Sequence, residues 1–316
     1  MIDSQVFADI VAKLKAAADK SGNNLKMDSL SISCGAKEFH YDFGAEEARA
    51  DLRSVSKPIL CMALGTALAK GLVAGGEKLT LETKVWPIFE NMVALSNTSN
   101  LANLRKLRLK HLLNNTIGHH EGMMFRKDIE GRDESRLLDY IFNSDIPHEP
   151  GTYFVYSNAG PYLISALIQR ATGSLASELV RKLIFDKLGI QNFSWKMLGE
   201  FCAGCTGLVL ANRDLNLIGR VLADDGQFRG AQIVPASWVR DMKSVFVKTP
   251  TMHDPKRAFP KYGYGHYLWK TEDGAAYCDG TDGQYLILLK DGATVISTLG
   301  HQPDMKPITE CFRGLL

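Results

Sequence analysis

Ser54 and Lys57 are spaced so that one could activate the other. They are the ends of the segment Ser54-Val-Ser-Lys57, which lies between a polar stretch and an apolar run with helical spacing. Residues three apart share one face of a helix, so the Lys57 amine would lie beside the Ser54 hydroxyl. A serine hydroxyl is a poor nucleophile until a neighbouring base takes its proton. The pair therefore predicts nucleophilic catalysis, with a simple helix cap at Ser54 as the alternative.

Tyr156-Ser157-Asn158 is the second candidate segment, and it is the only Tyr-x-Asn in the chain. It follows a predicted turn and precedes a predicted helix that begins near Pro161. Placed near Ser54, the Tyr156 hydroxyl could pass a proton to or from Lys57. We expect Tyr156 to act as a general acid and base, with a buried core tyrosine as the alternative. Asn158 either contacts the substrate or caps the helix.

The segment Gly280-Thr-Asp-Gly283-Gln284 could supply part of an oxyanion hole, and it opens a predicted strand. An acyl-transfer enzyme needs two N–H donors aimed at the oxygen that becomes negative in the transition state. The N–H groups of Ser54 and Thr281 are the simplest such pair, with Gly280 beside them. An ordinary hairpin turn is the alternative.

Apolar spacing places strands at both ends of the chain and helices between them. Strands are expected at 29–34, 38–43, 264–270, 275–278, 285–289 and 294–298. Helices are expected at 5–20, 55–71, 101–113, 134–143, 161–172, 177–188, 208–224, after Pro235 and at 305–316. The pattern predicts an α+β (mixed α/β) fold, in which an antiparallel sheet is formed from both chain ends and flanked by helices.

The same pattern predicts an all-helical domain inserted into the sheet domain. We expect residues 1–84 and 205–316 to form the sheet domain and residues 85–204 to form the helical one. The active site would lie in the cleft between the two domains.

Composition excludes several classes of protein. The chain has 316 residues, of which 45% are hydrophobic, and this is enough to bury a large core. Its 37 Lys and Arg nearly balance its 35 Asp and Glu, so no nucleic-acid-binding surface is indicated. The longest apolar stretch, 58–69, is shorter than the roughly 20 residues of a membrane span. Because the first residues do not resemble a signal peptide, we expect a cytoplasmic protein.

Two further groups of residues resemble metal sites, but we expect no metal at either. Cys202 and Cys205 have the spacing of a zinc knuckle, yet no second pair follows, so two buried thiols are the favoured interpretation. His119 and His120 are adjacent and would point apart, so surface or supporting roles are favoured. We expect no cofactor.

Taken in order, the motifs resemble those of the serine β-lactamase-like hydrolases, over about residues 28–300. This family includes class C β-lactamases, DD-peptidases, related esterases and nylon-oligomer hydrolases. The segments that carry the resemblance are Arg53-Ser54-Val-Ser-Lys57, Leu109–Gly118, Pro150–Gly160, Ala203–Leu208 and Tyr262–Gly265. The resemblance implies that Ser54 is the nucleophile, Lys57 its basic partner and Tyr156 the general acid and base, and that Asn158 contacts the substrate's amide.

One motif departs from this family's pattern. Penicillin-recognising members carry Lys-Thr-Gly or His-Thr-Gly where this chain has Cys278-Asp279-Gly280. The missing cation would attract the substrate's carboxylate, whereas Asp279 would repel it. The sequence therefore favours hydrolysis of a small-molecule ester or amide. The alternatives are a β-lactamase or DD-peptidase acting on lactams or D-Ala peptides, and a catalytically idle binding protein. No nucleic-acid or membrane partner is expected.

Overall fold

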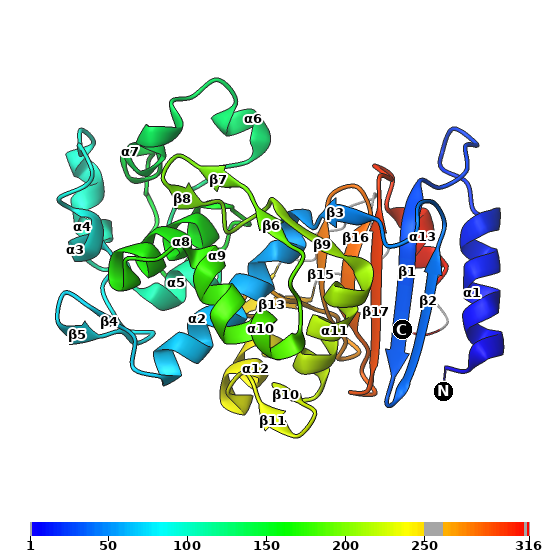
Figure 1. Cartoon of the computed structure of the whole chain (residues 1–316). Helices are drawn as coiled ribbons and strands as arrows, with labels where there is room; N and C mark the ends of the chain where they lie inside the picture. The colour runs from blue at the N-terminus through cyan, green and yellow to red at the C-terminus, as the bar shows by residue number, and fades with distance from the viewer. Residues whose placement is uncertain (1, 250–261, 313–314, 316) are drawn as a thin grey trace.

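The computed structural model describes residues 2–249, 262–312 and 315, and its main element is an eight-stranded antiparallel sheet (Figure 1). The strand order is β12-β13-β14-β15-β16-β17-β1-β2. In that order the bounds are Val247–Lys248, Gly263–Tyr264, Trp269–Lys270, Ala276–Gly280, Gln284–Leu288, Thr294–Gly300, Met27–Cys34 and Lys37–Asp42. Because β1 pairs with β17, strands from the two ends of the chain lie side by side. The predicted fold class is confirmed.

Helices cover both faces of this sheet. Helix α1 (Ser4–Ala16) lies along β2, where the ring of Phe7 stacks on that of Phe39 with centroids 5.2 Å apart (Figure 1). Side chains alternate between the two faces of a strand, so the neighbouring His40 points away from α1. On that second face α11 (Asn212–Ala223) packs against β1, β16 and β17.

The middle of the chain is mostly helical, as predicted. The remaining α-helices are α2 (Ser56–Ala69), α3 (Trp86–Phe89), α4 (Leu101–Leu104), α5 (Leu109–Leu113), α6 (Arg126–Ile129), α7 (Leu137–Asn143), α8 (Ala159–Thr172), α9 (Ala176–Val180), α10 (Asp186–Leu188), α12 (Ala236–Lys243) and α13 (Lys306–Glu310). A π-helical turn, Arg181–Phe185, joins α9 to α10, and 3₁₀ turns lie at Arg53–Val55, Thr98–Asn100 and Glu134–Arg136.

Short strands lie among these helices. They are β3 (Arg49–Asp51), β4 (Val73–Ala74), β5 (Glu77–Lys78), β6 (Ser194–Trp195), β7 (Met197–Leu198), β8 (Phe201–Cys202), β9 (Leu208–Ala211), β10 (Gln227–Phe228) and β11 (Ala231–Gln232). Strands β3, β9 and β6 form a small sheet that joins segments from both predicted domains. The boundaries at 84/85 and 204/205 stay a prediction.

Helix α2 runs through the core and is buried on all sides. Every residue from Ser56 to Leu68 is buried. Gly65 lets Trp238 pack directly on the helix, because a Cβ at Gly65 would lie 2.3 Å from the indole ring. The Trp238 indole N–H also donates to the carbonyl oxygen of Cys61, at 3.0 Å. A helix held in this way gives the side chains of its first turn a fixed position.

Tertiary pairing overrides the local pattern in two of the predicted helices. The helix expected at 208–224 begins as strand β9, whose Leu210 pairs with Ala50 of β3. The helix expected at 101–113 is interrupted where Arg108 forms a bridge with Lys84. Of the helix expected at 305–316, the structure shows α13 (Lys306–Glu310), and residues 313, 314 and 316 of that expected helix lie outside the described part.

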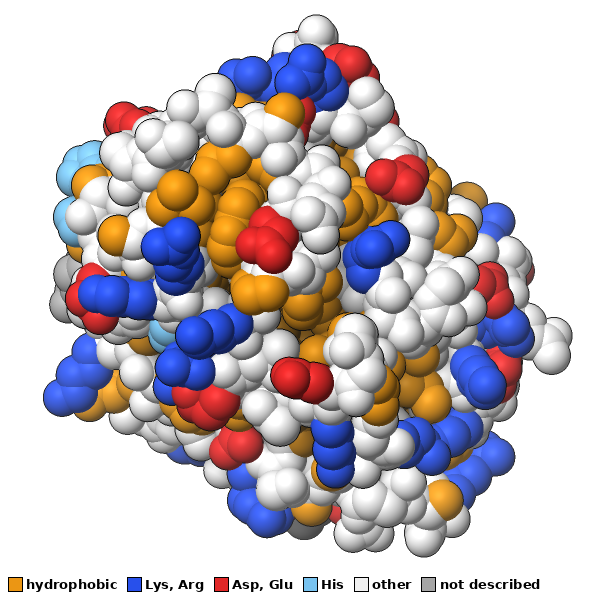
Figure 2. Space-filling view, turned by 90° about the vertical axis from the view of Figure 1, so that its left-hand side faces the viewer, with side chains coloured by type: hydrophobic (Ala, Val, Ile, Leu, Met, Phe, Trp, Pro, Cys, Tyr) orange, Lys and Arg blue, Asp and Glu red, His pale blue; other side chains and the backbone are white. Residues whose placement is uncertain are grey.

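The helical side of the molecule is hollowed. Figure 2 shows the side on which α3, α4 and the β4–β5 hairpin lie in Figure 1, and hydrophobic side chains gather in its central hollow. Within the described residues, no helix combines the length and the apolar character that crossing a membrane requires.

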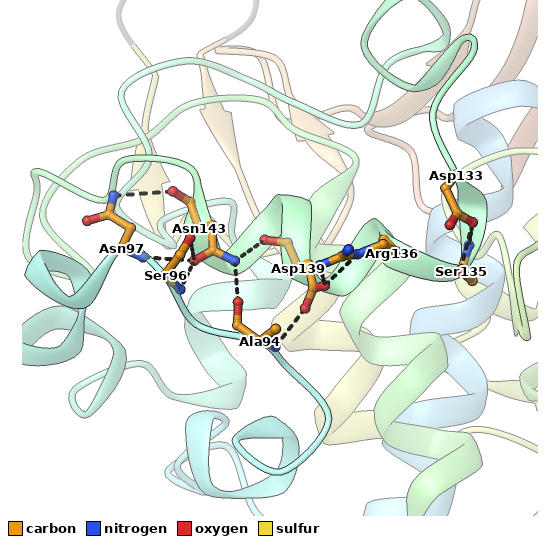
Figure 3. A network of polar contacts seen from close by, with 8 residues as sticks. All are labelled: Ala94, Ser96, Asn97, Asp133, Ser135, Arg136, Asp139 and Asn143. Atoms are coloured by element: carbon orange, nitrogen blue, oxygen red, sulfur yellow. Dashed lines mark hydrogen bonds and ion pairs between the residues drawn. The ribbon is translucent and has the colours of Figure 1, made fainter.

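Asn143, the last residue of α7, holds the loop that precedes α4 (Figure 3). Its side-chain oxygen accepts from the N–H groups of Ser96 and Asn97, at 2.7 and 2.9 Å, and from the Ser96 hydroxyl, at 2.9 Å. Its amide donates to the carbonyl oxygen of Ala94 at 3.1 Å. Asp139 adds a bond to the Ala94 N–H at 2.8 Å. The Asn143 side chain therefore makes most of the hydrogen bonds that order residues 94–97.

Asn143→Ala is expected to lower the free energy of unfolding by about 2–4 kcal/mol, because several hydrogen bonds are lost and the loop N–H groups lose their acceptor. Urea denaturation followed by circular dichroism measures this change. Asn24→Ala, at an exposed position, is the matched control and should change stability by less than about 0.5 kcal/mol. Equal midpoints for the two variants would show that Asn143 does not hold the loop.

Candidate active site

Ser54, Lys57 and Tyr156 meet at the start of α2. Ser54 lies in the 3₁₀ turn Arg53–Val55, and Lys57 is the second residue of the α-helix that continues it. The Lys57 amine donates to the Ser54 Oγ at 2.6 Å and to the Tyr156 hydroxyl at 2.8 Å. The structure thus brings together the three residues that the sequence predicts for the chemistry, although Tyr156 lies 99 residues from Lys57.

Lys57 is almost completely buried, with 1% of its surface exposed. Pro58, which follows it, is also buried and lies within the first turn of α2, where a missing N–H removes no helix bond. Within the part of the chain that the structure describes, no carboxylate forms an ion pair with the Lys57 amine. The amine instead bonds to two hydroxyl groups, which is an arrangement suited to exchanging protons with them.

Aromatic rings hold Tyr156 in place. Its ring lies nearly parallel to that of Trp269, with centroids 5.5 Å apart, and to that of Phe125, at 6.5 Å. Tyr264 meets it edge-on at 6.1 Å. Gly122 passes close to the Tyr156 backbone, since a Cβ there would lie 2.2 Å from the Tyr156 carbonyl oxygen. The sequence analysis did not identify Trp269, because aromatic residues far apart in sequence carry no signal that they will meet.

Asn158 occupies the N-cap position of α8 but does not cap it. Its side-chain amide donates to the carbonyl oxygen of Met124 at 3.1 Å, and Ser157 Oγ instead accepts from the N–H of Ala159 at 3.2 Å. Among the described residues, no donor reaches the buried Asn158 Oδ1. This oxygen can accept a hydrogen bond from an amide N–H. The contact between Asn158 and the substrate's amide stays a prediction.

The third motif lies directly against the Ser54 turn. Strand β15 ends at Gly280, and a Cβ added there would lie 2.6 Å from the Leu52 carbonyl oxygen and 2.7 Å from Arg53 Cβ. Thr281 follows at an exposed position. Glycine is therefore required where the two backbones touch, and this contact brings the Thr281 segment next to Ser54.

Cys278 and Asp279 of the same strand are both buried and point to opposite faces. Burial raises the pKa of the Cys278 thiol well above its usual value; the Asp279 carboxylate raises it further and Lys57 lowers it. A thiol held neutral and an acidic side chain thus precede Gly280 in this strand.

The cysteines and histidines considered as metal ligands lie in ordinary protein surroundings. Cys202 and Cys205 are buried free thiols, and burial raises their pKa values to about 12 and about 11. His119 is buried and its Nε2 bonds to the carbonyl oxygen of Ile141, while His120 lies outside and contacts His148. The two histidines do point apart. In the described ranges, no group of three or more His, Cys, Asp or Glu side chains could hold a metal.

A second serine has an activating partner, which the sequence analysis did not predict. Ser31 of β1 bonds to His40 Nδ1 at 2.7 Å, and His40 Nε2 bonds to Asp42 at 2.9 Å. Ser31 and His40 line a cavity of about 290 Å³ beside α11. Ser31 lies in mid-strand, however, where the neighbouring N–H groups are used by the ladders to β2 and β17, so no pair of donors is available for an oxyanion.

Comparisons with known proteins agree with this geometry. The Beta-lactamase family model matches residues 45–307. A 6-aminohexanoate-dimer hydrolase from Paenarthrobacter ureafaciens is 26% identical over 190 residues, which cover 58% of this chain and 48% of that protein. The match thus spans about half the length of this curated relative.

Solved structures share the fold. An octameric penicillin-binding protein homologue from Pyrococcus abyssi has a TM-score of 0.71 and 17% identity, over 100% of this chain and 77% of that one. A D-stereospecific amidohydrolase from Streptomyces has a TM-score of 0.69 and 16% identity, over 96% of this chain and 97% of that one. Since the family model covers most of the sequence and includes every predicted motif, the chain belongs to the beta-lactamase family.

Proposed function

We propose that the protein is a serine hydrolase that forms an acyl-enzyme on Ser54 and cleaves an ester or amide of a small molecule. The observation that carries the proposal is the position of the Lys57 amine, 2.6 Å from the Ser54 Oγ and 2.8 Å from the Tyr156 hydroxyl. A nucleophile, a base and a second proton carrier are thereby connected by two short hydrogen bonds.

In the first step the Ser54 Oγ attacks the carbonyl carbon, and its proton passes to the Lys57 amine, which is uncharged when it accepts it. The N–H groups of Ser54 and Thr281 stabilise the negative oxygen of the tetrahedral intermediate. The bond to the leaving group then breaks: Tyr156 gives its hydroxyl proton to the departing alcohol or amine and takes the proton held by Lys57, and the acyl group stays on Ser54 as an ester. Water, deprotonated by the same pair, attacks this ester and releases the acid.

The third motif supports a substrate without a β-lactam's carboxylate. The segment Cys278–Gly280 supplies a neutral thiol and an acidic side chain but no cation that could bind a β-lactam's carboxylate. The relative from Paenarthrobacter ureafaciens is a 6-aminohexanoate-dimer hydrolase, which supports amides as well as esters as substrates.

A panel of p-nitrophenyl esters, p-nitroanilides and a chromogenic cephalosporin tests the proposal. We expect turnover of short-chain esters, slower turnover of anilides, and cephalosporin turnover at least about 100-fold below that of the best ester, because the segment Cys278–Gly280 offers no cation to bind the cephalosporin's carboxylate. Intact-mass spectrometry during turnover should show the acyl adduct. Cephalosporin turnover equal to that of the esters would favour a β-lactamase, and inactivity on the whole panel without an adduct would favour a binding protein.

A further inference from the structure

Arg53, the residue before the proposed nucleophile, has a backbone conformation that is unusual for its type. Its φ angle is 52°, in the left-handed region that residues other than glycine adopt uncommonly. Such conformations persist only where the surrounding contacts enforce them, and they gather at functional sites. The contacts of Arg53 therefore indicate the role of this turn.

Asp51 holds the turn from one side. Its Oδ1 accepts from the N–H of Arg53 at 2.8 Å and from the N–H of Gly207 at 2.9 Å, and its Oδ2 accepts from Arg53 Nη1 at 2.8 Å. One carboxylate thus binds both the backbone and the side chain of Arg53 and ties them to the segment before β9. This places the Ser54 N–H in a fixed direction.

The other end of the Arg53 guanidinium reaches the third motif. Its Nη2 lies 3.1 Å from Asp282 Oδ2, and Asp282 directly follows Thr281 in the turn between β15 and β16. Asp282 is itself left-handed, with φ at 72°. Asp51, Arg53 and Asp282 form a chain of ion pairs, which we name the Arg53 bracket, between the turn of Ser54 and the turn of Thr281.

We infer that Arg53 is a positioning residue that sets the distance between the N–H groups of Ser54 and Thr281. The inference rests on the proposed function, in which these two groups form the oxyanion hole. A planar guanidinium suits the role because its two terminal nitrogens, Nη1 and Nη2, can each donate to a different carboxylate in a fixed direction.

Loss of the bracket should affect the transition state more than substrate binding. The negative oxygen exists only during the reaction, so misplaced donors lower kcat and leave KM nearly unchanged. A displacement of about 1 Å in such a site costs up to about 100-fold in rate. We therefore expect kcat to fall about 10- to 100-fold in variants without the bracket, with KM within about twofold.

Arg53→Gly is the decisive variant, because glycine adopts a φ of 52° without strain and the turn can keep its shape without the side chain. Asp282→Asn removes the partner's charge, and the double variant should lose no more than the worse single one, since both break the same link. Arg53→Lys, which keeps the charge but not the planar fork, should recover only part of the rate. Arg181→Ala, in a surface ion pair with Glu178, is the control and should have wild-type kinetics.

Each variant is compared with the wild type for kcat and KM on the best p-nitrophenyl ester, for the rate of reaction with a fluorophosphonate, and for thermal unfolding. A fall in kcat and in labelling rate, with unchanged KM and melting temperature, is the expected result. Wild-type kcat in Arg53→Gly, or an effect on KM alone, would overturn the inference while leaving Ser54 as the nucleophile. A wild-type protein that neither turns over ester nor takes up the probe would overturn the proposed function itself.

Discussion

Ser54→Ala is expected to reduce ester turnover by at least about 10⁴-fold, because no covalent intermediate can form without the hydroxyl. The methyl group of alanine fits wherever the serine side chain fits, so the fold should not change. Steady-state rates with a p-nitrophenyl ester, corrected for the spontaneous reaction, measure the loss. Circular dichroism and the melting temperature should match those of the wild type.

Ser31→Ala is the matched control for this variant. Ser31 also has a short hydrogen bond to a base, His40, but it lies within a strand whose N–H groups are already paired. We therefore expect full activity from Ser31→Ala. If Ser31→Ala abolished turnover and Ser54→Ala did not, the reaction would belong to the cavity beside α11 and the proposed mechanism would be wrong.

Lys57→Met has the second-largest expected effect. Methionine has nearly the length of the lysine side chain and fills the same buried space, but it can neither accept nor donate the proton. General base catalysis contributes about 10²- to 10⁴-fold, so kcat should fall by that factor. Because an apolar group replaces a buried amine that pairs with no carboxylate among the described residues, the free energy of unfolding should not fall.

Rate, labelling and urea denaturation of Lys57→Met separate these two effects. Lys182→Met, at an exposed position of the π-helical turn, should behave as the wild type in all three. Turnover within about tenfold of wild type would show that Tyr156 alone activates Ser54. A stable, inactive protein is the result that assigns the base to Lys57.

The local part of the site could be predicted from the sequence, because helical geometry sets it. Lys57 follows Ser54 by three residues, and the turn at the start of α2 brings the two polar groups to 2.6 Å. Pro58 does not break α2, and the reason is again local: N–H groups in the first turn of a helix have no partner within the helix. Tyr156 lies 99 residues from Lys57, and only the ordered set of motifs indicated that the two would meet.

What the sequence did not show depends on tertiary contacts that leave no local pattern. The run Leu208-Val-Leu-Ala fits a helix or a strand equally well, and pairing with β3 decides for the strand. Asn158 has the residue type and place of a helix cap, yet its amide binds the Met124 carbonyl oxygen and Ser157 does the capping. The two partners of Arg53 are Asp51, at the end of β3, and Asp282, in the turn after β15; they lie about 230 residues apart, and an Asp at either place is unremarkable by itself.

The most direct test is to treat the protein with a fluorophosphonate probe and to locate the adduct by peptide mass spectrometry. The proposed mechanism predicts one adduct per chain, on the peptide that contains Ser54, formed quickly by the wild type and by Ser31→Ala. It predicts no adduct on Ser54→Ala and slow labelling of Lys57→Met. An adduct that persists in Ser54→Ala, or its absence from the wild type, would contradict the assignment of Ser54 as the nucleophile.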